Sequence, residues 1–180
     1  MKKKITIAVV CAVLSCVCLI GTTFAWLVDK TDPVKNTFTV GDVDIELAET
    51  TGDEYKLIPG KTYSKNPTVT VKGGSEDCWV FVKIVKENNP DTYLTYSIDT
   101  SIWTALGEDG VYYKNVTSNA ADQPFAIITG NTVTVKSSLT RTQLQEIGAN
   151  VPAISFTAYA IQQEGFATPE AAWAEAKDGV

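Results

Sequence analysis

The stretch CWVFVKIV, which runs from Cys78 to Val85, decides the fold class of this chain. Its first five residues are all apolar, so both faces of a strand formed here must be covered by other parts of the protein. In the nearby stretch TVTVK, from Thr68 to Lys72, valine alternates with threonine. A period of two is typical of half-buried strands. We therefore predict a β-rich protein in which 78–85 forms a central strand covered on both sides.

The same alternation extends along most of the chain. VDIEL, from Val43 to Leu47, would direct its three apolar residues to one face. The preceding TFTV has the opposite parity, which predicts a bulge at Gly41-Asp42. The turn GEDG, Gly107 to Gly110, predicts a hairpin loop between Trp103 and Tyr112. Further strands are predicted at 93–98, 111–116, 125–128, 132–136 and 154–162.

Two short helices are predicted among the strands. One begins after Thr140 as N-cap and ends at Gly148. The other has Thr168 as N-cap and Pro169 at its first position, where a missing N–H costs nothing. Strands with two short helices over this length predict the all-β class, an antiparallel β-sandwich of jelly-roll type. This sandwich is expected to form a single domain over 37–180.

The N-terminus has the three parts of a secretory signal peptide. Lys2 to Lys4 are basic, Ile5 to Ile20 is uncharged and apolar, and Thr23-Phe24-Ala25 places small residues at positions −3 and −1. We therefore predict a signal peptide over 1–25, cut between Ala25 and Trp26. The alternative is an uncleaved anchor, because about 20 apolar residues suffice to span a bilayer.

Composition limits the partners of the processed chain. Removing 25 of 180 residues leaves 155, and removing three of the 15 basic residues leaves 12 against 21 acidic ones, a net charge of −9. Such a surface repels nucleic acid and anionic lipid, so no nucleic-acid partner is expected, and membrane contact is expected only through the signal segment before cleavage. Three of the four cysteines lie in the signal. Cys78, which remains, is expected to be a small buried hydrophobe.

The sequence contains no histidine, which removes Ser-His-Asp and Cys-His catalysis and every imidazole zinc site. We predict no catalytic residue, no cofactor and no metal site. Asp42, Asp44 and Glu46 alternate along one strand; they read as a solvent face, with loose Ca²⁺ binding as the alternative. The three tryptophans of the strands and last helix read as core rather than as a sugar-stacking platform; these are Trp79, Trp103 and Trp173.

Several stretches together resemble a known family. A signal ending GTTFAW is followed by DKTDPVKNTFTVGDVDIEL, then by LIPGKTYSKNPTVTVK, and the chain ends in AIQQEGFATPEAAWAEA. These residues resemble the SipW-processed secreted proteins of Gram-positive bacteria, the TasA/camelysin family. The N-terminal half carries the motifs that are specific to this family, whereas residues 88–135 contribute little to the resemblance.

The resemblance implies a non-enzymatic fibre subunit of the cell surface or biofilm matrix of a Gram-positive bacterium. In TasA-like fibres the mature N-terminus acts as a donor strand that completes a sheet of the next subunit. By that resemblance Trp26, Leu27 and Val28 would be the apolar plug within an arm over 26–36. The expected partner is a second copy in a head-to-tail homopolymer, together with other matrix or cell-wall components.

Three alternatives stay open at the sequence level. Camelysin-like members have been described as metallopeptidases, although a chain without histidine is a poor match to zinc. A monomeric cell-wall-binding module is the second alternative. Residues 26–36 could also be a frayed terminus or an ordinary first strand of their own domain.

Overall fold

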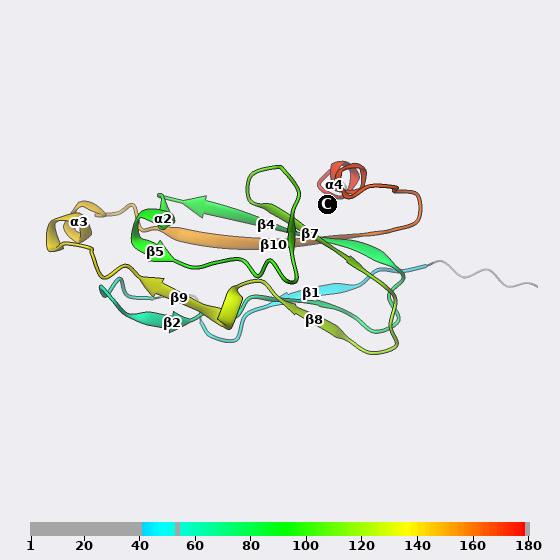
Figure 1. Ribbon diagram of the computed structural model, residues 1–180, viewed down its shortest axis with the longest axis horizontal. Coiled ribbons are helices and arrows are strands. Elements are labelled where there is room, and N and C mark those ends of the chain that lie inside the picture. The colour runs from blue at the N-terminus through cyan, green and yellow to red at the C-terminus, as the bar shows by residue number, and fades with distance from the viewer. Residues whose placement is uncertain (1–40, 53–54, 179–180) are drawn as a thin grey trace, which may run out of the picture. The chain divides into compact units, whose positions relative to one another are not determined.

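The computed structural model describes residues 41–52 and 55–178, which belong to one unit of the chain, Val40–Val180 (Figure 1). The predicted signal peptide, the cleavage site at Ala25 and Trp26, and the donor residues Trp26, Leu27 and Val28 lie outside the described residues. So does the strand predicted at 37–40, which leaves the bulge at Gly41-Asp42 untested. Within the described ranges no helix is long and apolar enough to cross a membrane.

The described part of the chain is mostly β, with every strand pair antiparallel. Three sheets have the strand orders β10-β4-β7-β6, β1-β3-β8 and β2-β9-β5. The strands are β1 Ile45–Ala48, β2 Thr62–Ser64, β3 Thr68–Val71, β4 Cys78–Glu87, β5 Leu94–Thr95, β6 Thr104–Ala105, β7 Val111–Val116, β8 Gln123–Ala126, β9 Thr132–Val135 and β10 Ala153–Gln162. The helices are α2 Pro90–Tyr93, α3 Arg141–Glu146 and α4 Pro169–Ala176, with a 3-10 turn η1 at Thr129–Asn131.

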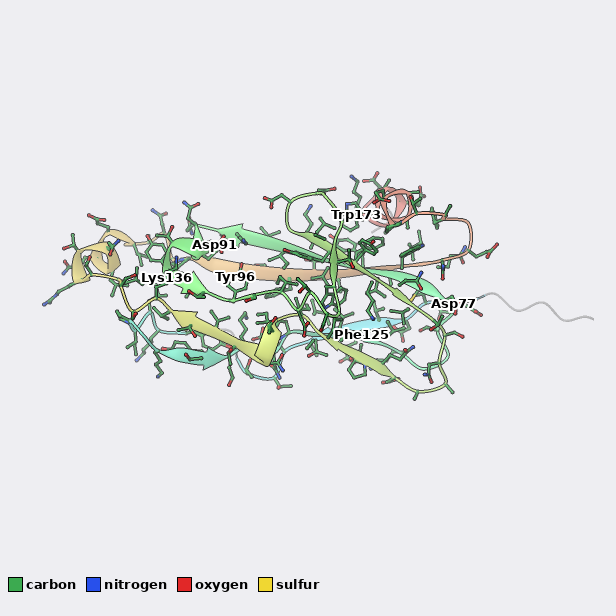
Figure 2. All side chains as sticks on the ribbon, in the orientation of Figure 1. Asp77, Asp91, Tyr96, Phe125, Lys136 and Trp173 are labelled. Atoms are coloured by element: carbon green, nitrogen blue, oxygen red, sulfur yellow. The ribbon has the colours of Figure 1, made fainter. Side chains whose placement is uncertain are left out.

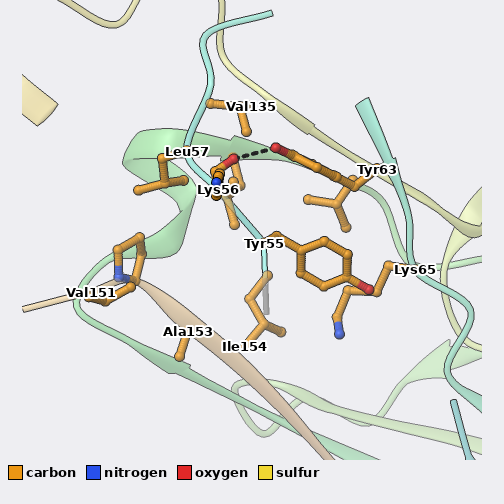
Figure 3. A pocket seen from close by; sticks show the side chains of 12 residues that line it. Tyr55, Lys56, Leu57, Tyr63, Lys65, Val135, Val151, Ala153 and Ile154 are labelled. Atoms are coloured by element: carbon orange, nitrogen blue, oxygen red, sulfur yellow. Dashed lines mark hydrogen bonds between the residues drawn. The ribbon is translucent and has the colours of Figure 1, made fainter. Parts of the chain in front are cut away.

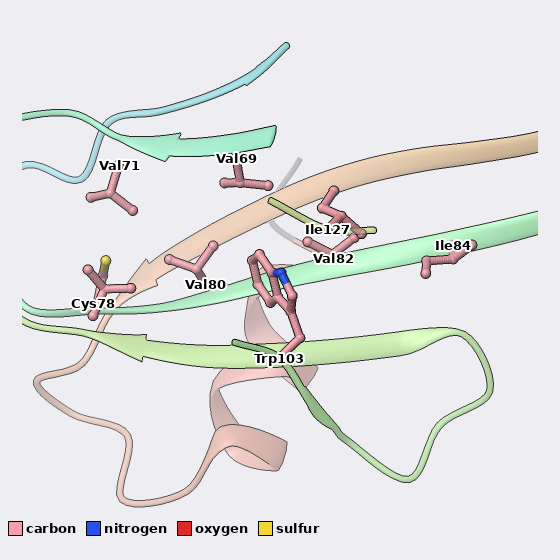
Figure 4. Close-up of a cluster of buried hydrophobic side chains, with 9 residues drawn as sticks. Val69, Val71, Cys78, Val80, Val82, Ile84, Trp103 and Ile127 are labelled. Atoms are coloured by element: carbon pink, nitrogen blue, oxygen red, sulfur yellow. The ribbon is translucent and has the colours of Figure 1, made fainter. Parts of the chain in front are cut away.

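Strand β4 is the central element that its apolar run predicts. It pairs with β10 along one edge and with β7 along the other. Because side chains alternate along a strand, Val80 and Val82 face the inner core, where they meet Val69 of β3 and the ring of Trp103 (Figure 4). Phe81, between them, faces the opposite side and packs against α4. The prediction of a strand covered on both faces is confirmed.

The two smaller sheets continue each other in one layer opposite β4. Strand β2 leads directly into β3, and β8 leads through η1 into β9. Two backbone hydrogen bonds bridge the junction: Lys65 N–H donates to the Asn131 carbonyl at 2.8 Å, and Ile127 N–H donates to the Pro67 carbonyl at 3.0 Å. The inner core lies between this layer and the β10-β4-β7-β6 sheet. The jelly-roll connectivity itself stays a prediction.

Helix α4 covers the outer face of β4. Its Trp173 ring lies 5.3 Å from the ring of Phe81 and 5.1 Å from that of Tyr159 on β10. The Trp173 indole N–H donates to the Glu108 carboxylate at 2.8 Å. Trp79 and Trp103 are also buried, so the prediction that all three tryptophans belong to the core is confirmed.

The predicted helix starts and the hairpin are confirmed. Thr140 caps α3 in a reciprocal capping box with Gln143, and the Thr168 hydroxyl accepts from Ala171 N–H at the start of α4. The loop 107–110 joins the paired strands β6 and β7. At Gly110 φ is +72°, and an added Cβ would lie 2.4 Å from the Ile84 carbonyl oxygen, so only glycine fits there.

The structure corrects two predicted strands. The strand expected at 93–98 is reduced to Leu94–Thr95, because Tyr93 belongs to the unpredicted helix α2. In VDIEL, Val43 and Ile45 pack against the inner core as expected, but Leu47 is exposed. The last three residues of β1, 46–48, are all exposed.

Candidate functional site

An apolar groove opens where the β2-β9-β5 sheet faces the start of β10 (Figure 3). Its volume is about 450 Å³. Three segments that are far apart in sequence form it: the stretch before β2, strand β9, and the residues that lead into β10. The lining residues are Tyr55, Lys56, Leu57, Tyr63, Lys65, Leu94, Val133, Val135, Val151, Pro152, Ala153 and Ile154.

Two tyrosines are fixed with their rings along the groove. The Tyr63 hydroxyl donates to the Lys56 carbonyl at 2.6 Å, and the Tyr55 hydroxyl donates to the Gly52 carbonyl at 2.6 Å. The two ring centroids are 5.2 Å apart. Because the hydroxyls already have backbone partners, the rings present apolar surface to the groove without leaving a polar group unpaired.

The groove has a buried floor and an exposed rim. Val135 on β9 is 1% exposed, whereas Val151, just before β10, is 58% exposed. An exposed branched apolar side chain beside an apolar hollow leaves surface that another chain can cover. The groove can therefore accept apolar side chains from outside.

Lysines line one side of this groove. The Lys65 ammonium pairs with the Glu49 carboxylate at 2.8 Å and lies 5.6 Å from the centre of the Tyr55 ring. Lys56 also lines the groove, and the Lys61 ammonium lies 4.9 Å from the centre of the Tyr63 ring. The groove therefore has two lysines in its lining, and the charge of one of them, Lys65, is already paired with a carboxylate.

The edge of β10 beside the groove is a second candidate surface. This ten-residue strand pairs with β4, and no other described strand pairs with it. Every second residue along such an edge directs its backbone N–H and C=O groups away from β4, which makes a row of groups that another strand can pair with. Most of its side chains are half-buried, and β1 of the facing layer contacts β10.

The start of the described chain lies at the other end of β10. Gly41 lines a polar hollow together with Glu76, Asp77 and Gln162, the last residue of β10. The groove, in contrast, contains Ala153, the first residue of β10. Figure 2 shows Asp77 at one end of the described unit and Asp91 with Lys136 at the other.

The alternating carboxylates face solvent, as predicted. Asp42, Asp44 and Glu46 are exposed. The Lys72 ammonium bonds to Glu46, which raises the Lys72 pKa, and Lys72 also pairs with Asp122 at 3.4 Å. Among the described residues no group of three His, Cys, Asp or Glu side chains is placed to hold a metal ion. The Ca²⁺ alternative gains no support from this geometry.

Cys78 is fully buried in the inner core, which confirms its prediction as a small hydrophobe. Burial, with a smaller effect from the neighbouring Asp77 charge, raises the pKa of its thiol to about 11. The thiol is therefore protonated at neutral pH, and a protonated thiol is neither a good nucleophile nor a metal ligand.

Sequence reasoning missed the groove and the open edge. The stretch LIPGKTYSK gave only a turn before a strand, and that turn is present, with Lys61 N–H donating to the Ile58 carbonyl at 3.0 Å. The available signal was the pair of tyrosines on either side of this turn, Tyr55 and Tyr63. The predicted donor residues cannot be placed against either surface, because they lie outside the described residues.

Comparison with known proteins adds one match. The family model described as camelysin metallo-endopeptidase matches residues 1–85, just under half of the 180-residue chain. This match confirms the resemblance to the TasA/camelysin family over the part of the sequence that carries its specific motifs. No curated protein and no solved structure matches the chain.

Proposed function

We propose that this chain, whose residues 1–85 match the camelysin family model, is a self-assembling fibre subunit of the bacterial cell surface or biofilm matrix. The proposed domains are a signal peptide over 1–25, an arm over 26–36 and a β-sandwich over 37–180. Signal peptidase cuts after Ala25 and leaves Trp26 as the first residue of the secreted protein. Subunits then join head to tail when the apolar triplet Trp26, Leu27 and Val28 adds to a sheet of the next copy.

The open edge of β10 is the observation that carries this proposal. Strand addition gains main-chain hydrogen bonds from such an edge and side-chain contacts from the pockets beside it. Soluble proteins usually protect a long edge by charges, bulges or a covering loop, because an exposed edge invites pairing with another chain. In the described part of this chain, β10 is ten residues long, pairs with β4 alone, and has an apolar groove at its start.

The energetic terms explain why both the apolar triplet and the edge are needed. A fully buried Trp, Leu or Val side chain contributes roughly 1.5–3 kcal/mol. Ordering the arm costs about 1–2 kcal/mol per residue in backbone entropy. The triplet alone cannot offset the ordering of an arm of eleven residues, 26–36. Hydrogen bonds to the edge of β10 must supply the balance.

Substitution of the triplet tests the proposal. We expect Trp26→Ser with Val28→Asp to give a folded, monomeric protein without filaments in electron micrographs, because the plug becomes polar. The matched control is Thr31→Ser with Asn36→Asp, which introduces the same two residue types into the arm without removing an apolar side chain and should leave the filaments intact. Filaments of normal length from the triplet variant would contradict the proposal.

The name of the matched family favours a second candidate, a metallo-endopeptidase. The residues of this chain do not fit a zinc site: the sequence has no histidine, and the Cys78 thiol is buried and protonated. Casein hydrolysis by the purified protein that a chelator abolishes, and that added zinc restores, would support this second candidate. A protein that leaves casein intact under all metal conditions would exclude it.

A further inference from the structure

We propose that the apolar groove binds a free fatty acid, with one hydrocarbon chain inside the groove and the carboxylate at its rim beside Lys56. The inference concerns a small-molecule site on the folded domain and does not depend on fibre assembly. Three properties of the groove select this class of ligand: the chemistry of its walls, its volume, and the charge at its rim.

The walls of the groove select a hydrocarbon chain. The hydroxyls of Tyr55 and Tyr63 each donate to a backbone carbonyl at 2.6 Å, so neither proton is left for a ligand. A polar group buried here would lose its hydrogen bonds to water without gaining equivalent ones, which is unfavourable. The buried part of the ligand must therefore be hydrocarbon. Most of the other lining side chains are aliphatic, namely Leu57, Leu94, Val133, Val135, Val151 and Ile154.

The volume and exposure of the groove suit a molecule with a single chain and a polar head. Its volume of about 450 Å³ lies in the lower half of the roughly 300–1,000 Å³ that is typical of small-molecule pockets. Val135 closes the floor with 1% exposure, whereas Val151 at the rim is 58% exposed. The tail of the ligand is therefore buried at the floor while its head stays in contact with water.

The charge around the groove selects an anionic head. Lys56 and Lys65 line the groove, and no described Asp or Glu does. Lys65 is paired with Glu49 at 2.8 Å, whereas Lys56 is exposed and no carboxylate of the described residues pairs with it. The Lys61 ammonium adds a positive charge 4.9 Å from the centre of the Tyr63 ring. A carboxylate at the rim thus meets a local excess of positive charge.

The negative net charge of the chain favours a free acid over a membrane surface. The chain carries a formal charge of −6, but exposed charges more than about 8 Å apart are largely screened at physiological ionic strength. A single carboxylate in the groove is therefore governed by the lysines beside it. An anionic membrane extends well beyond that distance and meets the acidic remainder of the protein, which repels it.

Equilibrium dialysis of the secreted chain beginning at Trp26 tests the hydrocarbon part. The probes are octanoate and decanoate, used below the concentrations at which they form micelles. Burial of one CH₂ group contributes about 0.8 kcal/mol, which is roughly a factor of four in affinity. Decanoate should therefore bind about fifteenfold more tightly than octanoate. Equal affinity of the two acids, or binding of neither, would overturn the proposal.

The head group is tested with decylamine, which has a chain of ten carbons and is cationic at pH 7. Decanoate should bind more tightly than decylamine, and this advantage should shrink in 1 M salt, where charges are screened. Equal affinities at low salt would overturn the anionic class and would mean that the lysines are offset, for example by Asp53 and Glu54, which lie outside the described residues. Sedimentation of the protein with phosphatidylglycerol vesicles would make a membrane surface the ligand and overturn the free acid.

One pair of substitutions tests whether the acid lies in the groove. Ala153→Phe adds a ring where β10 begins and should abolish decanoate binding, because the ring occupies the space of the chain. The matched control Ala105→Phe adds the same ring on β6, which does not line the groove, and should leave binding unchanged. Circular dichroism verifies that both variants retain their β structure.

A second pair keeps the test valid if Ala153→Phe does not fold. Lys56→Glu changes an exposed side chain and should weaken decanoate binding about two- to tenfold. Lys177→Glu makes the same charge change just after α4, away from the groove, and should have no effect. The variant with Trp26→Ser and Val28→Asp should bind decanoate normally, so loss of filaments and loss of ligand are separate results. Unchanged binding by both Ala153→Phe and Lys56→Glu would place the acid elsewhere and overturn the inference.

Discussion

The Cys78 side chain connects burial with chemistry at the scale of one residue. It is fully buried on β4, and its thiol pKa is raised to about 11, mainly by burial. An unfolded cysteine has a pKa of about 8.5. The folded state therefore binds the thiol proton more tightly than the unfolded state. The associated stability is complete below pH 8.5 and is lost as the pH rises toward 11.

This predicts two results for Cys78. A thiol reagent at pH 8 should label the protein only after a denaturant unfolds it. The free energy of unfolding of the native sequence should fall more between pH 8 and pH 11 than that of Cys78→Ala, which lacks the titrating group. Rapid labelling of the folded protein, or identical pH dependence of the two proteins, would contradict the assigned burial.

The β6–β7 hairpin allows a matched comparison at the scale of one element. Gly107 and Gly110 both have positive φ, of +94° and +72°, and an alanine at either position is strained by roughly 1–2 kcal/mol. Only at Gly110 would the added Cβ also meet backbone, at 2.4 Å from the Ile84 carbonyl oxygen; at Gly107 the space is open. We expect Gly110→Ala to lower the free energy of unfolding by clearly more than Gly107→Ala in urea titrations. Equal losses would mean that the close approach of the hairpin to β4 is wrong.

The elements also separate what sequence can predict from what it cannot. Strand β4 was predictable because an uninterrupted apolar run admits few positions other than the centre of a sheet. Helices α3 and α4 were predictable because Thr140 and Thr168 carry cap signals in the local sequence. Helix α2 was missed: it follows Asn88 and Asn89, both with positive φ, and Pro90 begins it between the strands predicted at 78–85 and 93–98. Asparagine tolerates this left-handed backbone, so the pair Asn88-Asn89 was a weak sequence signal for a turn before the helix.

The groove was beyond sequence analysis for a different reason. Its walls come from residues 55–57, from β9 and from the start of β10, and the first and last of these segments are about a hundred positions apart in the chain. Periodicity reports which face of a strand is buried, but not which buried faces leave a gap between them. The unpaired edge of β10 has the same origin, because strand order depends on long-range pairing.

Processing is the first prediction at the scale of the whole molecule. N-terminal sequencing of the exported protein should begin at Trp26, because Thr23 and Ala25 supply the small residues that a signal peptidase requires. Replacing Ala25 with leucine should leave the precursor uncut. Recovery of Lys2–Lys4 on the exported protein would instead support an anchored form, and the triplet would then not be a free terminus.

The central claim is that residues 26–36 drive assembly of an otherwise folded domain, and sedimentation velocity tests it most directly. The secreted chain beginning at Trp26 and a chain beginning at Thr37 should be compared at matched concentrations, with circular dichroism to verify that both retain their β structure. The account predicts large, polydisperse assemblies for the first chain and a single folded monomer for the second. Assemblies of the same size from both chains, or a folded chain beginning at Trp26 that stays monomeric at every concentration, would contradict it.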